Sequence, residues 1–158
     1  MMKVGFGFDV HPLVNERKLI IGGIEIPFQK GLAGHSDADV LCHAIGDALL
    51  GAAGLGDLGF HFPSTDEKYR NISSLILLEQ IQKLLIENKF EVINIDSTIV
   101  AEKPQMSPFI SSMIANIAKA LNTKINQISI KATTTKGLGP IGTGDRIAAY
   151  AVCLVESK

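Results

Sequence analysis

Hydrophobic and polar positions alternate in the first segment of the chain, which is typical of a β-strand. Over residues 3–11, one face carries large apolar side chains: Val4, Phe6, Phe8 and Val10. The other face carries two glycines and two polar residues: Gly5, Gly7, Asp9 and His11. Because successive side chains of a strand point to opposite faces, we expect a strand with two different surfaces. Short apolar runs at 19–21 and 24–26 flank a Gly-Gly pair and predict a two-residue hairpin.

Hydrophobic residues at helical spacing predict helices further along the chain. The first is expected over residues 37–53, with Ser36 as its N-cap and acidic residues in its first turn. A second is expected over residues 72–88, and a third begins at Ser107-Pro108, where proline suits the first turn. Residues 54–66 are rich in Gly, Pro, Ser and Asp, so we expect a long loop without regular structure there.

Further strands are predicted over residues 91–101, 128–135 and 146–156, with a glycine-rich turn over 137–144. The order of elements predicts an α+β fold, in which helices cover one face of a mostly antiparallel or mixed β-sheet. The last strand is apolar on both faces, so both faces should be buried. We expect the second face to pack against another subunit, and a strand sandwiched within one subunit fits the pattern equally well.

Length and composition indicate one globular domain over residues 1–158. Hydrophobic residues make up 46% and charged residues 20%, which excludes a disordered chain. A net charge of -1 gives no electrostatic footprint for nucleic acid or for an anionic membrane. Two cysteines are too few for a disulfide framework, and no apolar run has the length of a membrane span or a signal core. A cytoplasmic location is therefore expected.

Three side chains form a candidate metal site. Asp9 and His11 leave the same face of the predicted strand, and His43 lies within the first predicted helix. One carboxylate and two imidazoles leave a coordination position open, as in catalytic zinc sites, and they also fit the facial triad of non-heme iron enzymes. The alternative is that His43 is a structural residue that makes hydrogen bonds to its neighbours and binds no metal. Asp39 or Asp47, four residues from His43, could orient its ring.

Two segments are candidates for binding a phosphate. His35 and Ser36 end a loop at a predicted helix N-terminus, where free amides and the helix dipole favour an anion. Ser36 as a simple cap is the alternative. Residues 132–137 offer successive threonine hydroxyls and a lysine where a strand enters a glycine-rich turn. Threonine runs are also common in ordinary strands, so this segment alone does not establish a site.

Together these segments resemble the 2-C-methyl-D-erythritol 2,4-cyclodiphosphate synthase family of the non-mevalonate isoprenoid pathway, over essentially the whole chain. The motifs occur in family order and at family spacing: GFDVH (7–11), IGG (21–23), GHSDADV (34–40), DALLGAA (47–53), GDLG (56–59), FPSTD (62–66) and KATTT (131–135).

The resemblance implies a homotrimer with active sites between adjacent subunits, and the activity of a metal-dependent phosphorus–oxygen lyase. The implied substrate is 4-diphosphocytidyl-2-C-methyl-D-erythritol 2-phosphate. Its 2-phosphate attacks the β-phosphorus of the same molecule, so that the 2,4-cyclodiphosphate forms and CMP leaves. Such a reaction needs no protein nucleophile, because the enzyme folds the substrate and neutralises phosphate charge.

The same resemblance assigns roles by motif. It implies Zn²⁺ or another divalent ion on Asp9, His11 and His43, and transition-state stabilisation by His35 and Thr134. The implied substrate-binding residues are Asp9, Val10, His11, His35, Ser36, Asp57, Leu58, Gly59, Phe62, Pro63, Ser64, Thr65 and Asp66. The implied nucleotide-binding residues are Ala101, Glu102, Lys103, Pro104, Gln105, Met106, Ser107, Ala132, Thr133, Thr134, Thr135 and Lys136.

The chain departs from the family pattern at several positions. Lys136 follows the threonine run where many members have an acidic residue that holds a second Mg²⁺ or Mn²⁺. We therefore expect a weakened second-metal site, with the Lys136 ammonium partly replacing the ion. Ser64 stands where Asp is usual, and Gln105 where Lys is common. Thr143 stands in a segment that lacks an arginine associated with a trimer-axis cavity. A catalytically silent metal- or nucleotide-binding module is the rival hypothesis.

Overall fold

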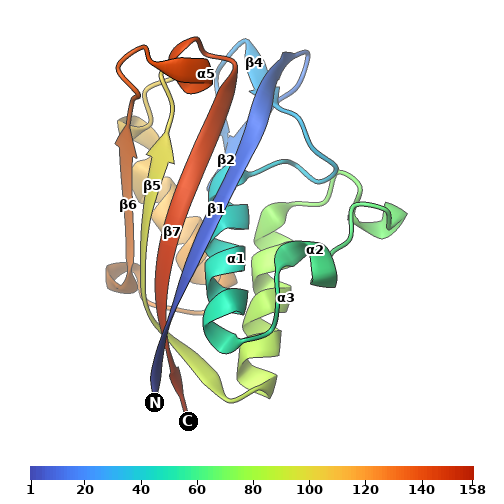
Figure 1. Cartoon of the computed structure of the whole chain (residues 1–158), viewed down its shortest axis with the longest axis vertical. Helices are drawn as coiled ribbons and strands as arrows, with labels where there is room; N and C mark the ends of the chain where they lie inside the picture. The colour runs from blue at the N-terminus through green and yellow to red at the C-terminus, as the bar shows by residue number, and fades with distance from the viewer.

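A mixed five-stranded sheet forms one layer of the structure. The computed structural model describes residues 1–158, and the strands lie in the order β4-β1-β7-β5-β6 (Figure 1). Their bounds are β1 Met2–Asn15, β4 Lys30–Leu32, β5 Phe90–Val100, β6 Ile128–Thr133 and β7 Arg146–Ser157. The β5–β6 pair is parallel and the other pairs are antiparallel, so the predicted mixed sheet is confirmed. The central pair β1–β7 brings the two ends of the chain together (Figure 1).

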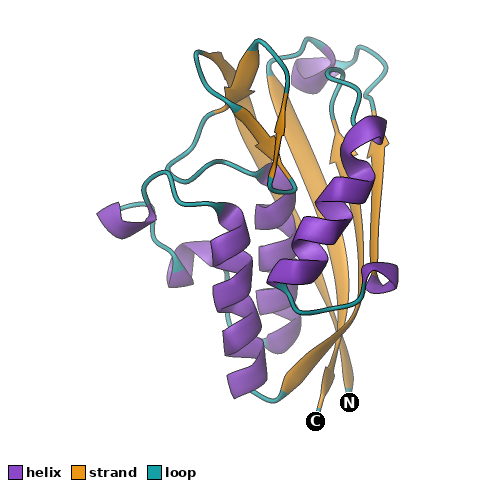
Figure 2. Cartoon of the chain, turned by 180° about the vertical axis from the view of Figure 1, so that it is seen from behind, coloured by secondary structure: helices purple, strands orange, loops and turns teal.

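Helices cover one face of this sheet, as Figure 2 shows from behind. They are α1 Val40–Ala53, α3 Ser74–Glu87 and α4 Ile110–Ala120. Side chains of β7 that face them are buried: Ile147, Ala149, Ala151, Cys153 and Val155. Burial of this apolar layer supplies the main driving force for folding. None of the helices combines the length and hydropathy that crossing a bilayer requires.

Two glycines allow β1 to approach α1 closely. A β-carbon at Gly5 would lie 1.9 Å from the Ala48 carbonyl oxygen, and one at Gly7 would lie 1.9 Å from the Ala44 carbonyl oxygen. These distances are far below van der Waals contact, so only glycine fits at either position. The polar face of the predicted first strand is thus the face that meets the helices.

The large apolar side chains of β1 point away from the helices and are uncovered. Phe6 is 65% exposed, and its neighbours Val4, Phe8 and Val10 are exposed as well. Tyr150 of β7 joins them, with its ring centroid 4.9 Å from that of Phe8. The alternative of a strand sandwiched within one subunit is therefore wrong, since the chain itself covers only one face. A contiguous apolar surface of this kind usually marks an interaction site.

Several element boundaries differ from the predictions. The hairpin is confirmed as β2 Leu19–Ile21 and β3 Ile24–Ile26. Helix α1 begins at Val40 rather than residue 37, because Asp39 and not Ser36 is its N-cap. The predicted loop over 54–66 contains a helical turn, α2 Leu58–His61, which Asp57 caps. Asp39 was missed because Asp and Ser are equally good N-caps, so sequence alone does not choose between them. The turn α2 was missed because the composition of its segment is typical of a loop.

Several short elements complete the chain. A 3₁₀ turn at Ser107–Phe109 precedes α4, and other 3₁₀ turns lie at Glu67–Tyr69 and Ile125–Gln127. The predicted glycine-rich turn contains the short helix α5 Gly139–Gly142. The strand β4 was not predicted, because its residues Lys30–Leu32 show too short a pattern to be recognised.

Candidate active site

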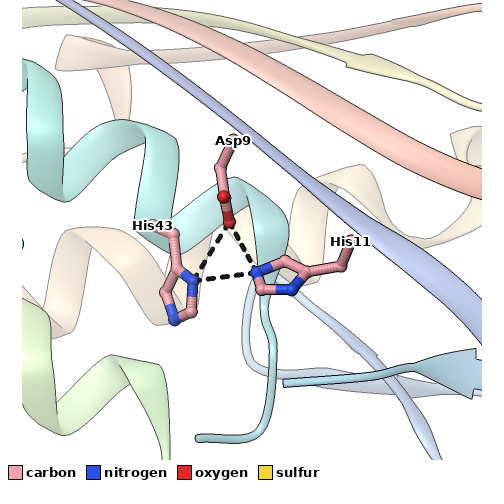
Figure 3. Close-up of side chains that lie close together, drawn as sticks. All are labelled: Asp9, His11 and His43. Atoms are coloured by element: carbon pink, nitrogen blue, oxygen red, sulfur yellow. Dashed lines mark hydrogen bonds and ion pairs between the residues drawn. The ribbon is translucent and has the colours of Figure 1, made fainter. Parts of the chain in front are cut away.

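The structure brings the three predicted metal ligands together where β1 meets α1 (Figure 3). Asp9 Oδ2 lies 2.7 Å from His11 Nε2 and 3.1 Å from His43 Nδ1. The two imidazole nitrogens are 3.2 Å apart. Asp9 and His11 reach this point from one face of the strand, and His43 reaches it from the facing side of the helix.

These donor atoms fit a divalent ion. Ligands bonded at about 2.0–2.1 Å to a tetrahedral zinc lie roughly 3.3–3.4 Å from one another. The separations of 2.7–3.2 Å between the three atoms need only a small outward adjustment to match that geometry. One carboxylate and two imidazoles suit Zn²⁺ and also other divalent ions, and they leave a coordination position for a substrate oxygen.

The Asp9 carboxyl and the His43 imidazole influence each other's pKa. Burial disfavours the Asp9 carboxylate, but hydrogen bonds and charge from His11 and His43 outweigh it and hold the pKa of Asp9 well below its usual range. Burial likewise disfavours protonation of His43, but its contact with Asp9 is stronger and raises the pKa of His43. A pocket that holds an ionised carboxylate beside two imidazoles is well suited to bind a cation.

Other atoms fix the orientation of both rings. His11 Nδ1 lies 2.8 Å from the Ala33 carbonyl oxygen, which can only accept, so this nitrogen donates and His11 Nε2 is free to ligate. His43 Nε2 lies 3.1 Å from Ser36 Oγ and 2.9 Å from Ser74 Oγ. Both ligating nitrogens are therefore aimed at Asp9 by partners on the far side of each ring.

The expectation that Asp39 or Asp47 orients His43 is wrong. Asp39 is fully buried and accepts hydrogen bonds from three backbone amides, those of Gly22, Gly23 and Cys42. Its place at the helix N-cap turns its side chain toward those amides and away from the helix face that carries His43. Asp47 accepts instead from the backbone amide of Leu58, at 2.8 Å. Cys42 is buried in the core.

A cavity of about 170 Å³ opens beside the candidate metal site formed by Asp9, His11 and His43. It is lined by two of the predicted metal ligands, His11 and His43, and by six residues predicted to bind substrate: His35, Ser36, Leu58, Gly59, Phe62 and Ser64. The His35 ring is held by a hydrogen bond of 3.0 Å between its Nε2 and the Asp66 carbonyl oxygen. Tyr69 and Leu77 also line this cavity and were not predicted, because they lie in segments without a polar motif.

Other predicted substrate residues lie outside this cavity. Val10 is on the opposite, exposed face of β1. Asp57 accepts from the Phe60 amide and so caps α2. Thr65 lines a neighbouring, entirely polar cavity of about 440 Å³ that contains Arg17 and Arg70. The polar cavity shares His35 and Ser64 with the first one, so the two cavities adjoin.

A separate pocket of about 590 Å³ gathers the predicted nucleotide-binding segments. All of residues 101–107 line it, together with Ala132, Thr133, Thr134 and the unpredicted Phe28. Glu102 links the two segments, since its carboxylate accepts hydrogen bonds from the Thr135 amide at 2.8 Å, the Thr135 hydroxyl at 3.1 Å and the Gly137 amide at 3.3 Å. Thr135 and Lys136 lie next to this pocket rather than in its lining.

The two residues predicted to stabilise the transition state do not meet within one chain. His35 lines the cavity beside the metal cluster, and Thr134 lines the larger pocket. The two cavities have no lining residue in common.

The fold and the donor set define an α+β protein with a candidate carboxylate–imidazole metal site. Residues 2–156 match the YgbB family, and the chain belongs to this family. A relative named 2-C-methyl-D-erythritol 2,4-cyclodiphosphate synthase, from Clostridium novyi (strain NT), is 59% identical over 157 residues, which cover 99% of this chain and 100% of the relative. The resemblance inferred from the sequence motifs is thus confirmed.

Solved structures of related proteins share the fold. The bifunctional IspDF from Campylobacter jejuni matches with a TM-score of 0.96 and 41% identity, over 100% of this chain and 43% of that one. A CDP complex of IspF from Plasmodium falciparum matches with a TM-score of 0.87 and 32% identity, over 99% of this chain and 97% of that one. The α+β fold with helices on one face of a mixed sheet is therefore that of the YgbB family.

Proposed function

We propose that the protein converts 4-diphosphocytidyl-2-C-methyl-D-erythritol 2-phosphate to 2-C-methyl-D-erythritol 2,4-cyclodiphosphate and CMP. The observation that carries this proposal is the convergence of Asp9, His11 and His43 in a chain 59% identical to a synthase of that name. The activity is that of a metal-dependent phosphorus–oxygen lyase of the non-mevalonate isoprenoid pathway.

The chain's own residues have distinct tasks in this reaction. Asp9, His11 and His43 hold the divalent ion, for which Zn²⁺ is the proposed identity. When bound, the ion supplies a Lewis acid for a phosphate oxygen. His35 and the residues beside it hold the methylerythritol phosphate near the cluster. Since the attacking phosphate belongs to the substrate itself, the protein contributes orientation and charge stabilisation rather than a nucleophile.

The larger pocket is the proposed site for the cytidine diphosphate. Two stretches of chain, residues 101–107 and 132–134, line it together with Phe28, and they offer threonine and serine hydroxyls that suit a nucleotide. Glu102 fixes the loop that carries Thr134, so that the Thr134 hydroxyl is available to the diphosphate. The Plasmodium falciparum relative forms a complex with CDP, which supports a cytidine diphosphate ligand for this protein.

We further propose a homotrimer of one-domain subunits, with each active site shared between neighbours. Two observations support this arrangement. The uncovered apolar face of β1 and β7 needs a partner, and His35 and Thr134 line different cavities of one chain. A neighbouring subunit can bring one chain's candidate metal site to the other's nucleotide pocket.

One hydrophobic core, built from both ends of the chain, supports a single domain over residues 1–158. Two buried, unpaired cysteines support a reducing, cytoplasmic location.

We propose that the binding site for the family's second divalent ion is weakened in this protein. Lys136 is exposed, and its amide donates to Thr134 Oγ1 at 3.2 Å. An ammonium cannot ligate a cation, but it can neutralise part of the charge of a diphosphate. We therefore assign Lys136 a share of the role that Mg²⁺ or Mn²⁺ has in other members.

The experiment is incubation of zinc-loaded protein with the CDP-linked substrate, with CMP and the cyclic diphosphate followed by phosphorus NMR. Wild-type protein is expected to form both products, and His43→Ala is expected to form neither while its oligomeric state persists. Tight CDP binding without turnover would instead support a silent binding module. Iron in the purified protein, together with oxygen consumption, would support an iron oxygenase. Normal turnover by metal-free His43→Ala would end the assignment.

A further inference from the structure

We propose that Ser74 and Asp37 are positioning residues that set the hydrogen-bonding state of His43 and thereby the affinity of the metal site. The inference rests on the proposed function only in taking Asp9, His11 and His43 as ligands. Neither Ser74 nor Asp37 touches Asp9 or His11, and neither is among the residues expected to bind substrate or ion.

A continuous hydrogen-bonded chain connects these residues. Ser74 Oγ lies 2.9 Å from His43 Nε2, the ring nitrogen that faces away from Asp9. The Ser74 hydroxyl also makes a close hydrogen bond with Asp37 Oδ1, and the Ser74 amide donates to Asp37 Oδ2 at 2.9 Å. Ser74 is 1% exposed, so water does not compete for these contacts. Because Asp37 accepts hydrogen bonds from both the amide and the hydroxyl of Ser74, it fixes this buried serine in place.

The order of donors along this chain follows from chemistry. A carboxylate only accepts, so the single Ser74 hydroxyl proton is directed at Asp37. Ser74 Oγ must then accept at its other contact, and His43 Nε2 must donate to it. The proton of the neutral imidazole therefore lies on Nε2, and the lone pair lies on Nδ1, the atom 3.1 Å from Asp9 Oδ2. Nδ1 is thus prepared to ligate a metal ion.

Ser36 does not replace Ser74 in this role. Its hydroxyl lies 3.1 Å from His43 Nε2 and accepts from the Ala38 amide at 3.2 Å. No carboxylate holds the Ser36 proton in these contacts, so the hydroxyl is free to donate to the ring or accept from it. Ser36 therefore tolerates either tautomer, whereas the bond with Asp37 makes Ser74 selective for one.

The hydrogen-bonded chain also links His43 to the packing of α1 against α3. Asp37 precedes α1, which carries His43, and Ser74 is the first residue of α3. The Asp37 amide donates to the Ile72 carbonyl at 3.0 Å, so the two segments are joined by main chain as well. The N-terminus of α3 thereby positions a ligand that is 31 residues away in sequence.

The test is the zinc dissociation constant of the metal-free protein, measured by competition with a chelator. Ser74→Ala is expected to weaken zinc binding by about 10–100-fold, the usual effect of removing a ligand's hydrogen-bond partner. Ser73→Ala is the matched control: Ser73 caps the same helix through the Leu75 amide but has no contact with His43. This control is expected to lower thermal stability and to leave zinc affinity unchanged.

A second variant tests the donor order by removing the acceptor of the Ser74 hydroxyl proton. Asp37→Ala leaves the Ser74 hydroxyl free to donate to His43 Nε2, which then no longer has to carry the ring proton. Zinc binding is expected to weaken as with Ser74→Ala, and this variant carries the test if Ser74→Ala does not fold. Wild-type zinc affinity in folded Ser74→Ala or Asp37→Ala protein would overturn the proposal. Loss of CMP release with wild-type zinc affinity would also overturn it, while a wild-type protein that binds zinc but releases no CMP would count against the proposed function only.

Discussion

Gly7 of β1 and Ala44 of α1 approach so closely that a β-carbon on Gly7 would lie 1.9 Å from the Ala44 carbonyl oxygen. Gly7 is two residues before Asp9, and Ala44 directly follows His43, and both Asp9 and His43 are proposed ligands. The separation between strand and helix at this contact therefore sets how near the carboxylate and the imidazole can come. Gly7 therefore helps to form the proposed metal site even though it has no side chain to contribute.

Gly7→Ala should damage both stability and metal binding. The added methyl meets main-chain atoms that cannot rotate away, so strand and helix must separate, at a cost of about 1–3 kcal/mol or more. Urea unfolding measures the stability, and chelator competition measures the zinc affinity. Gly51→Ala is the control, because a β-carbon there meets nothing within 4 Å and should stabilise α1 by about 0.5–1 kcal/mol. Equal zinc affinity in folded Gly7→Ala and wild-type protein would contradict this account.

Phe6→Glu should dissociate the proposed trimer. Phe6 is 65% exposed on the apolar face of β1, and a charge placed in the buried centre of an interface has no partner. Light scattering after size-exclusion chromatography is expected to give a trimer for wild type and a monomer for the variant. Ile86→Glu is the control, since Ile86 is similarly exposed, at 60%, but lies on helix α3. A trimeric Phe6→Glu protein would show that this face is not the interface.

Lys136 should reduce the dependence of the enzyme on a second divalent ion. Zinc-loaded wild-type protein is expected to turn over without added Mg²⁺ or Mn²⁺, because the ammonium remains beside the diphosphate. Lys136→Glu should lower activity in the absence of Mg²⁺ and restore it when Mg²⁺ is added, as a carboxylate can ligate that ion. Initial rates across a Mg²⁺ titration measure both effects. An absolute Mg²⁺ requirement in the wild-type protein would refute the assignment.

Glu102 should stabilise the nucleotide pocket in a pH-dependent way. Burial opposes its ionisation, but hydrogen bonds from the Thr135 and Gly137 amides outweigh burial and lower the pKa of Glu102 below its ordinary value of 4.5. A lowered pKa means that the contribution to stability is present above 4.5 and is lost as the pH falls through the folded-state value. Glu102→Gln should therefore be less stable than wild type at about pH 7, with a difference that shrinks in acid. A difference in urea midpoint that does not change with pH would contradict this assignment.

Local patterns along the chain predicted much of the fold and of the site. The alternation in β1 placed Asp9 and His11 on one face, and the Gly-Gly pair identified the hairpin. The same alternation did not reveal that Phe6 faces outward, because a single sequence does not distinguish a core from an interface. Ser74 was missed since its contact with His43 depends on how α3 packs against α1. Asp39 was misassigned because the cap geometry, not its spacing from His43, determines its direction.

The most direct measurement of the central claim is anomalous diffraction at the zinc edge from crystals grown with zinc and CDP. We predict one zinc peak per chain, bonded to Asp9 Oδ2, His11 Nε2 and His43 Nδ1 at about 2.0–2.2 Å, with a phosphate oxygen of CDP in the remaining position. A structure in which these three atoms share no metal peak, or in which CDP binds far from it, would contradict the account.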